Sequence, residues 1–310
     1  MAKRKKLNPA DYIVPININN MNGRMLRMPS QKSKANEILV IYGMHASIER
    51  MFGFAEELNK YGTVTIPDLP GFGGMDPLYK IGEKATLDNL ADYLTSFVKL
   101  RYKKKRVTII AMSYGFLVVT RMLQKYPEIS KKIELLVSLV GFVHYEDFHI
   151  KRSTLTLIKM VSKFGSYKLP AFILKTLVFR GPQIKFTYRI IAKNHRKLYD
   201  ADEVELEKRI NFETELWKIN DVRTRARVAN DMFKVDLCKT RVNLPVTHVA
   251  IANDHFFDNG IVEQHMNIIY SNVTVITADM KGHAPTVVAD AATAAAYLPK
   301  ELRKLLSRKK

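Results

Sequence analysis

The stretch RVTIIAMSYGFLVV, residues 106–119, decides the fold. Residues 106–112 have the apolar, β-branched composition of a buried strand, and the residues after Ser113 continue at once as an apolar helix. Such a turn folds the chain back on itself, so the residues two before and two after the serine must be small. They are Ala111 and Gly115, and none of the other eleven serines has Gly, Ala or Ser at both of these positions. The pattern predicts a strained turn that holds the Ser113 hydroxyl at the carboxyl edge of a sheet.

Segments rich in β-branched and apolar residues alternate with amphipathic helical patterns on both sides of this turn. Two short extended segments around the polar residues 19–23 predict an antiparallel hairpin. Thr86, with Asp88 in the first helical turn, is the expected N-cap of a helix. The alternation as a whole predicts a parallel sheet with helices on both faces. We expect strands at 37–43, 63–69, 106–112, 133–142, 244–254 and 272–279, and helices at 47–62, 86–102, 114–127, 260–270 and 285–306.

The alternation is interrupted once. Residues 144–243 are basic, are mostly helical by pattern and contain no clear strand. We therefore expect a core formed by residues 1–143 and 244–310, and a helical cap formed by residues 144–243. The apolar stripe at 154–179 is expected mainly to pack as core between the cap and the sheet. An acyl-binding roof, or a lid that touches lipid, remains the alternative for this stripe.

The chain of 310 residues is strongly basic, with a formal net charge of +20. No recognition-helix, zinc-finger or RNA-binding motif accompanies this charge, so we expect no specific nucleic-acid partner. A weak attraction to anionic membrane surfaces is compatible with it, and the oligomeric state stays open. The single cysteine, Cys238, excludes an intramolecular disulfide and favours a reducing compartment. No apolar segment follows the basic N-terminal residues, so we expect no signal peptide and a cytoplasmic location.

The loops of this sequence resemble those of the α/β-hydrolase superfamily, over most of residues 12–143 and 244–306. AMSYG, residues 111–115, is similar to the G-x-S-x-G nucleophile elbow of that family, with alanine in the first small position. Tyr42 stands where the oxyanion loop of the family often carries a histidine. Four further loops resemble the family in chain order, namely IYGMHAS (41–47) as oxyanion loop, DLPGFGGM (68–75) as D-x-x-G-x-G loop, IANDHFFD (251–258) as acid loop and KGHAP (281–285) as histidine loop.

The resemblance implies an α/β-hydrolase fold with a mostly parallel eight-stranded sheet, helices on both faces and an inserted helical cap. It also implies a catalytic triad. Ser113 is the expected nucleophile, His283 the general base and Asp254 the acid that orients the imidazole. Three other residues stay open as alternatives for the acid, namely Asp258, Glu146 and Asp147.

The oxyanion hole follows from the same resemblance. The backbone N–H groups of Met44 and Tyr114 are the expected donors to the oxygen that becomes negatively charged. Gly43 and Tyr42, on the same loop as Met44, are expected to border the substrate. The two departures from the family pattern, at Tyr42 and Ala111, remove no reacting group.

These residues predict a serine hydrolase that opens a small-molecule acyl ester through an acyl-enzyme and needs no cofactor. Cleavage of an amide, peptide or thioester bond by the same fold stays open, as do a catalytically inactive binding protein and a peripheral lid-type lipase. The glycines at 71, 73 and 74 do not match a dinucleotide fingerprint, because no third glycine and no helix follow. We expect no metal site, because the four neighbouring polar residues His144, Glu146, Asp147 and His149 form no ligand motif.

Overall fold

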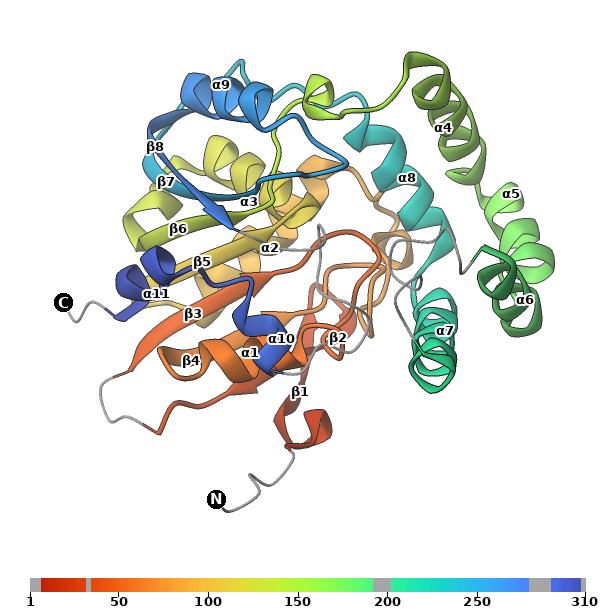
Figure 1. Cartoon of the computed structure of the whole chain (residues 1–310), viewed down its shortest axis with the longest axis horizontal. Coiled ribbons are helices and arrows are strands. Elements are labelled where there is room, and N and C mark those ends of the chain that lie inside the picture. Colours follow the sequence, from red (N-terminus) through yellow and green to blue (C-terminus); the bar gives the residue numbers. More distant parts are fainter. Residues whose placement is uncertain (1–6, 32–34, 192–201, 279–290, 308–310) are drawn as a thin grey trace.

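The computed structural model describes residues 7–31, 35–191, 202–278 and 291–307. These residues form one sheet of eight strands in the spatial order β1-β2-β4-β3-β5-β6-β7-β8 (Figure 1). The pairs β1–β2 and β2–β4 are antiparallel and every other pair is parallel, which confirms the predicted sheet. The strands are β1 (Ile13–Ile18), β2 (Met21–Met28), β3 (Asn36–Ile41), β4 (Gly62–Pro67), β5 (Val107–Met112), β6 (Ile133–Leu139), β7 (Val242–Ile251) and β8 (Tyr270–Ala278).

The antiparallel edge of the sheet is the predicted hairpin. Its connection consists of Asn19 and Asn20, which both have positive φ angles, 51° and 61°. A two-residue turn of this kind matches the twist of the flanking strands, and asparagine tolerates the left-handed conformation better than most residues. The turn is therefore shorter than the polar stretch 19–23 that we expected.

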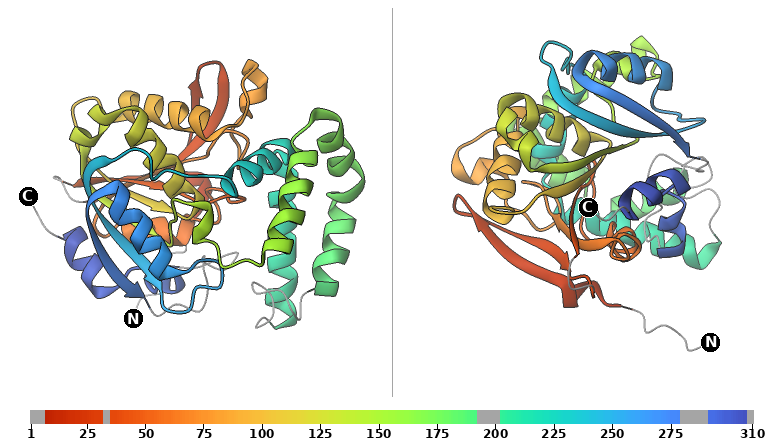
Figure 2. Two further views of the ribbon diagram at one scale, coloured as in Figure 1. Left: turned by 90° about the horizontal axis from the view of Figure 1, so that it is seen from above. Right: turned by 90° about the vertical axis from the view of Figure 1, so that its left-hand side faces the viewer.

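Helices cover both faces of the sheet. Six of them belong to the α/β core: α1 (Phe52–Leu58), α2 (Leu87–Arg101), α3 (Tyr114–Lys125), α9 (Asn259–Ile269), α10 (Ala291–Ala295) and α11 (Lys300–Ser307). The helices α2 and α3 pack on each other against one face, and α1 and α10 contact each other on the opposite face (Figure 2). Every residue of β4 and β5 is buried, as expected for central parallel strands covered on both sides.

Helix boundaries agree with the sequence where a local signal exists. The Thr86 hydroxyl accepts a hydrogen bond from the backbone N–H of Asn89 at 3.2 Å, which confirms it as the N-cap of α2. Of the long helix expected over 285–306, residues 285–290 lie outside the described residues, and the prediction of one continuous helix is wrong for the rest. The chain there forms two helices, α10 and α11, because Pro299 has no N–H to donate and cannot continue a helix. Helix α1 is also shorter than expected and begins only at Phe52.

Between β6 and β7 the chain forms a set of helices that we call the helical insertion (residues 140–241). They stand together to one side of the sheet (Figure 2, left). Helix α4 packs against α8, and α6 packs against α7. The members are α4 (Arg152–Gly165), α5 (Lys168–Ile173), a π-helical turn (Leu174–Val178), α6 (Gly181–Ile191), α7 (Glu203–Ile219) and α8 (Val222–Met232).

Within the described ranges, no helix combines the length and the apolar composition that are needed to cross a bilayer.

Candidate active site

The turn at Ser113 has the strained geometry that its sequence predicts. Strand β5 ends at Met112, α3 begins at Tyr114, and Ser113 between them has φ 48° and ψ −122°. A non-glycine residue in such a region costs of order 1–3 kcal/mol, so the surrounding structure must hold it there. The backbone N–H of Ser113 donates to the carbonyl oxygen of Leu139 at 3.0 Å, which ties the turn to the end of β6. The Ser113 side chain is partly exposed at the carboxyl edge of the sheet.

The requirement for a small residue at position 115 has a visible cause. A Cβ atom added to Gly115 would lie 2.5 Å from the carbonyl oxygens of both Ile41 and Tyr42. These atoms belong to the backbone at the end of β3, so they cannot move aside as a flexible side chain would. Ala111, on the other side of the turn, is fully buried. The first turn of α3 therefore fits directly against the end of β3.

This contact gives a first testable prediction. We expect Gly115→Ala to destabilise the protein by about 3 kcal/mol, because the added methyl group overpacks a rigid backbone contact. The matched control is Gly181→Ala, whose added methyl group would meet no atom closer than 3.6 Å. Urea unfolding at pH 7 measures both variants. Equal midpoints for the two variants would contradict the packing role of Gly115.

The loop after β3, which is the expected oxyanion loop, lies beside Ser113. A Cβ atom added to Gly43 would lie 3.2 Å from the Ser113 Cβ atom and 3.7 Å from its Oγ atom. Met44 is the next residue of this loop and is partly buried. Tyr114 is the first residue of α3, where backbone N–H groups have no partner within the helix. Its side chain is buried, so Tyr114 offers the site its backbone only.

The buried carboxylate of Asp68 is hydrogen-bonded to both ends of this loop. Asp68, the first residue of the D-x-x-G-x-G loop, accepts hydrogen bonds from the Tyr42 hydroxyl at 2.7 Å and from the backbone N–H of Ile48 at 3.2 Å. It also accepts from Arg24 Nε at 2.7 Å. The Tyr42 side chain is fully buried in this arrangement. Its hydroxyl therefore fixes the loop, which differs from the substrate contact that the sequence led us to expect.

The middle of the same loop is joined to the helical insertion. His45, which has a positive φ of 57°, is buried with its ring 4.6 Å from the ring of Trp217 on α7. Its Nδ1 atom is 3.1 Å from the side-chain nitrogen of Asn220. Arg50 donates to the His45 carbonyl oxygen at 3.0 Å and also pairs with Glu213 on α7. The position of the neighbouring Met44 N–H therefore depends on contacts between the core and α7.

The structure separates the candidates for the catalytic acid by their hydrogen bonds. Asp254 follows β7 by three residues and accepts from the backbone N–H of Phe256 at 2.8 Å. Asp258 is the N-cap of α9, where its side chain accepts from two backbone N–H groups. Asp147 is fully buried and lies 2.5 Å from His265 Nδ1, whereas Glu146 is exposed. Asp258 thus caps a helix and Asp147 is buried against His265, whereas Asp254 is partly exposed.

The proposed base does not belong to the described part of the chain. His283 lies in the stretch 279–290, outside the described residues. Of the three expected triad residues, the structure thus places Ser113 and Asp254 at the ends of β5 and β7, on the carboxyl side of parallel strands.

His144, which follows β6, and His265, which lies on α9, are close together in the fold. Ligand atoms of His144, Glu146 and His265 lie within 4.8 Å of one another. His144 Nδ1 accepts from the backbone N–H of Glu146 at 3.2 Å, and His265 Nδ1 pairs with Asp147. The δ nitrogens of both rings are thus engaged by the protein itself, and these contacts join the start of the helical insertion to α9.

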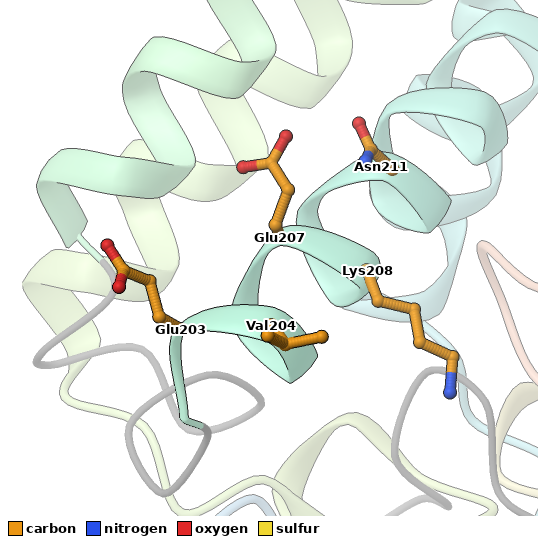
Figure 3. A pocket seen from close by; sticks show the side chains of 5 residues that line it. All are labelled: Glu203, Val204, Glu207, Lys208 and Asn211. Carbon is orange, nitrogen blue, oxygen red and sulfur yellow. The ribbon is translucent and has the colours of Figure 1, made fainter.

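Two hollows of the described surface lie on or beside α7. The hollow in Figure 3 is lined by residues of α7 alone, and the second lies between loops of the core and α7. Ser113 lines neither, so we assign substrate binding to neither. The lining residues in Figure 3 are Glu203, Val204, Glu207, Lys208 and Asn211.

The buried His248 is expected to make the folded protein less stable in acid. His248 on β7 is buried, with Nδ1 2.9 Å from the Ser138 hydroxyl, and burial lowers its pKa to about 4. Its pKa in the unfolded chain is about 6.5, so below that pH the unfolded state binds more protons and is favoured. We expect this group to remove about 2 kcal/mol of stability between pH 7 and pH 5. Urea unfolding at both pH values measures it.

The variant His248→Asn provides the control for this prediction. It should lose about 2 kcal/mol less stability than the wild type over the same pH change. Any general effect of the high net charge is common to both proteins and cancels in the difference. The same pH dependence in both proteins would refute the assignment to His248.

The comparison with protein families agrees with this architecture. A family described as the alpha/beta hydrolase fold matches residues 36–287. The match covers most of the chain, and the protein therefore belongs to the α/β-hydrolase fold family. This membership supports its classification as a hydrolase.

Solved structures resemble the protein over nearly its whole length. An α/β hydrolase named MGS-M2, from a Medee basin deep-sea metagenome library, has a TM-score of 0.68 at 15% identity and covers 96% of this chain and 98% of its own. A thermophilic esterase from Thermogutta terrifontis has a TM-score of 0.59 at 17% identity, and the match covers 96% of this chain and 99% of the esterase. An enol-lactonase from Burkholderia xenovorans has a TM-score of 0.64 at 10% identity, and the match covers 95% of this chain and 100% of the enol-lactonase. At these identities the likeness establishes the fold. No curated protein sequence matches the chain.

Proposed function

We propose that the protein is a serine hydrolase that cleaves a carboxylic ester through an acyl-enzyme on Ser113. The observation that carries the proposal is the backbone of Ser113, held at φ 48° between a strand and a helix and beside Gly43. Strain of this kind persists where the rest of the structure maintains it, and it clusters at active sites. A buried structural serine would need neither this conformation nor the partial exposure of its side chain.

The proposed reaction uses Ser113 as the nucleophile and His283 as the general base. His283 takes the proton of the Ser113 hydroxyl as the Oγ atom attacks the carbonyl carbon of the ester. The tetrahedral intermediate carries its negative charge on the former carbonyl oxygen, next to the N–H groups of Met44 and Tyr114. The intermediate collapses, and the alkoxide leaves with the proton from His283. Water, deprotonated by the same histidine, then releases the acid and restores Ser113, while Asp254 orients the imidazole.

The helical insertion is proposed to act as a cap domain on the core, close to the expected bounds of 144–243 for the cap but ending before Val242, where β7 of the core begins. Contacts at the junction of α7 and α8 support this division. The backbone N–H of Asp221 donates to the carbonyl oxygen of Gly71 at 2.8 Å, and the Asn220 side chain accepts from Gly73 at 2.8 Å. With His45 held against α7, the cap meets the core at the loops that follow β3 and β4. We further propose a cytoplasmic location, which the unpaired Cys238 supports.

A series of p-nitrophenyl esters of increasing acyl length tests this function. We expect the wild type to hydrolyse at least one ester and Ser113→Ala to hydrolyse none above the uncatalysed rate. A matching p-nitroanilide and a thioester decide between ester, amide and thioester cleavage. Hydrolysis by neither protein across the whole series would favour a binding protein of the same fold, and equal hydrolysis by both would exclude Ser113 as nucleophile.

A further inference from the structure

The exposed apolar side chains of the protein are concentrated on one part of the helical insertion. Of the 21 large apolar residues that are exposed in the described ranges, 12 lie between Leu157 and Ile190. Leu169 and Phe172, for example, are 67% and 64% exposed. The expectation that the stripe at 154–179 packs mainly as core is therefore wrong for most of its large side chains. Contiguous apolar exposure beyond a few hundred Å² marks an interaction site in soluble proteins.

Helix α4 shows how this exposure arises. Its inner face packs against α8, and Ser162 and Gly165 on it are buried. A second apolar stripe faces solvent, at the spacing i, i+3, i+4, i+7 that lines one side of a helix. Its members are Leu157, Met160, Val161 and Phe164, each exposed by 57% to 60%. The helix has two apolar faces, and one of them has no partner among the described residues.

The charge of the same segment has one sign only. No Asp or Glu occurs between Asp147 and Asp200, whereas this stretch contains twelve Lys and Arg residues. Lys163, Lys168 and Lys175 are exposed beside the apolar stripe. The acidic residues all lie outside this stretch of the sequence, and Glu207 of α7 pairs with Arg189 of α6, so the unbalanced positive charge lies on α4, α5 and the π-helical turn, where it attracts anions.

We propose that this surface, formed by α4, α5 and the π-helical turn and here called the basic apolar surface, docks on an anionic lipid bilayer. Exposed leucine and phenylalanine side chains would enter the boundary between headgroups and acyl chains, and the lysines would contact anionic headgroups. Figures 1 and 2 show these helices on the side of the molecule away from the sheet, which leaves them open to a flat surface.

A second copy of the chain fits this surface less well. A two-fold interface places the same patch of both subunits face to face, so the basic rims would oppose each other without an acidic counterpart. The proposal rests on exposure and charge and does not depend on the proposed function. Ser113→Ala should therefore bind vesicles as the wild type does.

Co-sedimentation with vesicles tests the proposal. The full-length protein is mixed at 0.1 M NaCl with vesicles of phosphatidylcholine alone, or with 30% phosphatidylserine. We expect binding to the phosphatidylserine vesicles that is at least about tenfold tighter than to the neutral ones and weakens as NaCl is raised to 0.5 M. Equal binding to both vesicle types, or no binding to either, would overturn the proposal.

Two pairs of variants locate the contact. Reversing the charge at 163, 168 and 175 (Lys163→Glu, Lys168→Glu, Lys175→Glu) should weaken binding at least about tenfold. The control reverses the same number of exposed lysines on the core, Lys103→Glu, Lys104→Glu and Lys131→Glu. The double variant Leu169→Ser with Leu177→Ser should also weaken binding at least about tenfold. Its control is the double variant Leu100→Ser with Ile268→Ser, which changes two exposed apolar residues of the core.

The controls decide what the surface binds. If the core variants lose as much binding as the insertion variants, the attraction is a general effect of net charge and the proposed surface is wrong. If the leucine variant instead abolishes a concentration-dependent dimer seen by analytical ultracentrifugation, and the wild type does not bind vesicles, the surface is a contact between copies. Vesicle binding lost only in the insertion variants supports the proposal.

Discussion

Replacing Ser113 by alanine is expected to lower kcat/KM for the best ester substrate by about a thousandfold or more. The hydroxyl oxygen is the only atom removed, and in the proposed mechanism this atom forms the bond to the substrate. The loss should appear in kcat, with KM changed only a few fold, because the pocket and the oxyanion loop stay in place. Steady-state kinetics on purified wild type and variant measure both constants.

Ser96→Ala is the matched control for this experiment. Ser96 lies on α2, where its hydroxyl donates to the carbonyl oxygen of Asp92 at 3.0 Å. The control should keep full activity, and all three proteins should have similar urea midpoints. Ser113→Ala with an activity within a few fold of the wild type would show that the serine is not the nucleophile.

Asp254→Asn is expected to lower kcat by about a thousandfold, since an amide in place of the acid favours the wrong histidine tautomer and leaves the imidazolium unsupported. Asp258→Asn is the matched control, four residues further along the chain. Asparagine caps a helix as well as aspartate does, so α9 should keep its N-cap and the activity should stay within about twofold. Steady-state kinetics on the same ester compare the two variants.

The same pair of variants decides between the two aspartates. If Asp258→Asn loses activity and Asp254→Asn does not, the acid is Asp258 and the capping role described above is secondary. If both keep full activity, the acid lies elsewhere, and Asp147→Asn becomes the next variant to measure. A pH–rate profile of Asp254→Asn adds a readout that simple misfolding would not give, because the pH dependence of the base should shift.

The sequence predicts the sheet and the elbow well because both depend on local patterns. Buried parallel strands are continuous apolar runs, and β4 and β5 are buried at every position. A strand, a serine and a helix in direct succession leave the chain few conformations, and Ser113 adopts the strained one that was expected. The cap of α2 by Thr86 follows in the same way from neighbouring residues.

Contacts between distant segments were not predicted. Asn220 contacts His45, which is 175 residues away in the sequence, and neither residue belongs to a local motif that predicts this contact. The burial of the Tyr42 side chain against Asp68 depends likewise on how two loops pack. Periodicity also shows that a helix has an apolar face but not whether that face is covered, and Phe164 on α4 illustrates an apolar face that faces solvent.

The most direct test of the account is covalent labelling with a fluorophosphonate, which reacts with activated serines. The reagent mimics the ester carbonyl, and the serine oxygen displaces fluoride from its phosphorus atom. Intact-mass spectrometry and peptide mapping should find one adduct per chain, on the tryptic peptide that contains Ser113, and none on Ser113→Ala. No adduct on the wild type, or the same adduct on both proteins, would contradict the assignment of Ser113 as an activated nucleophile.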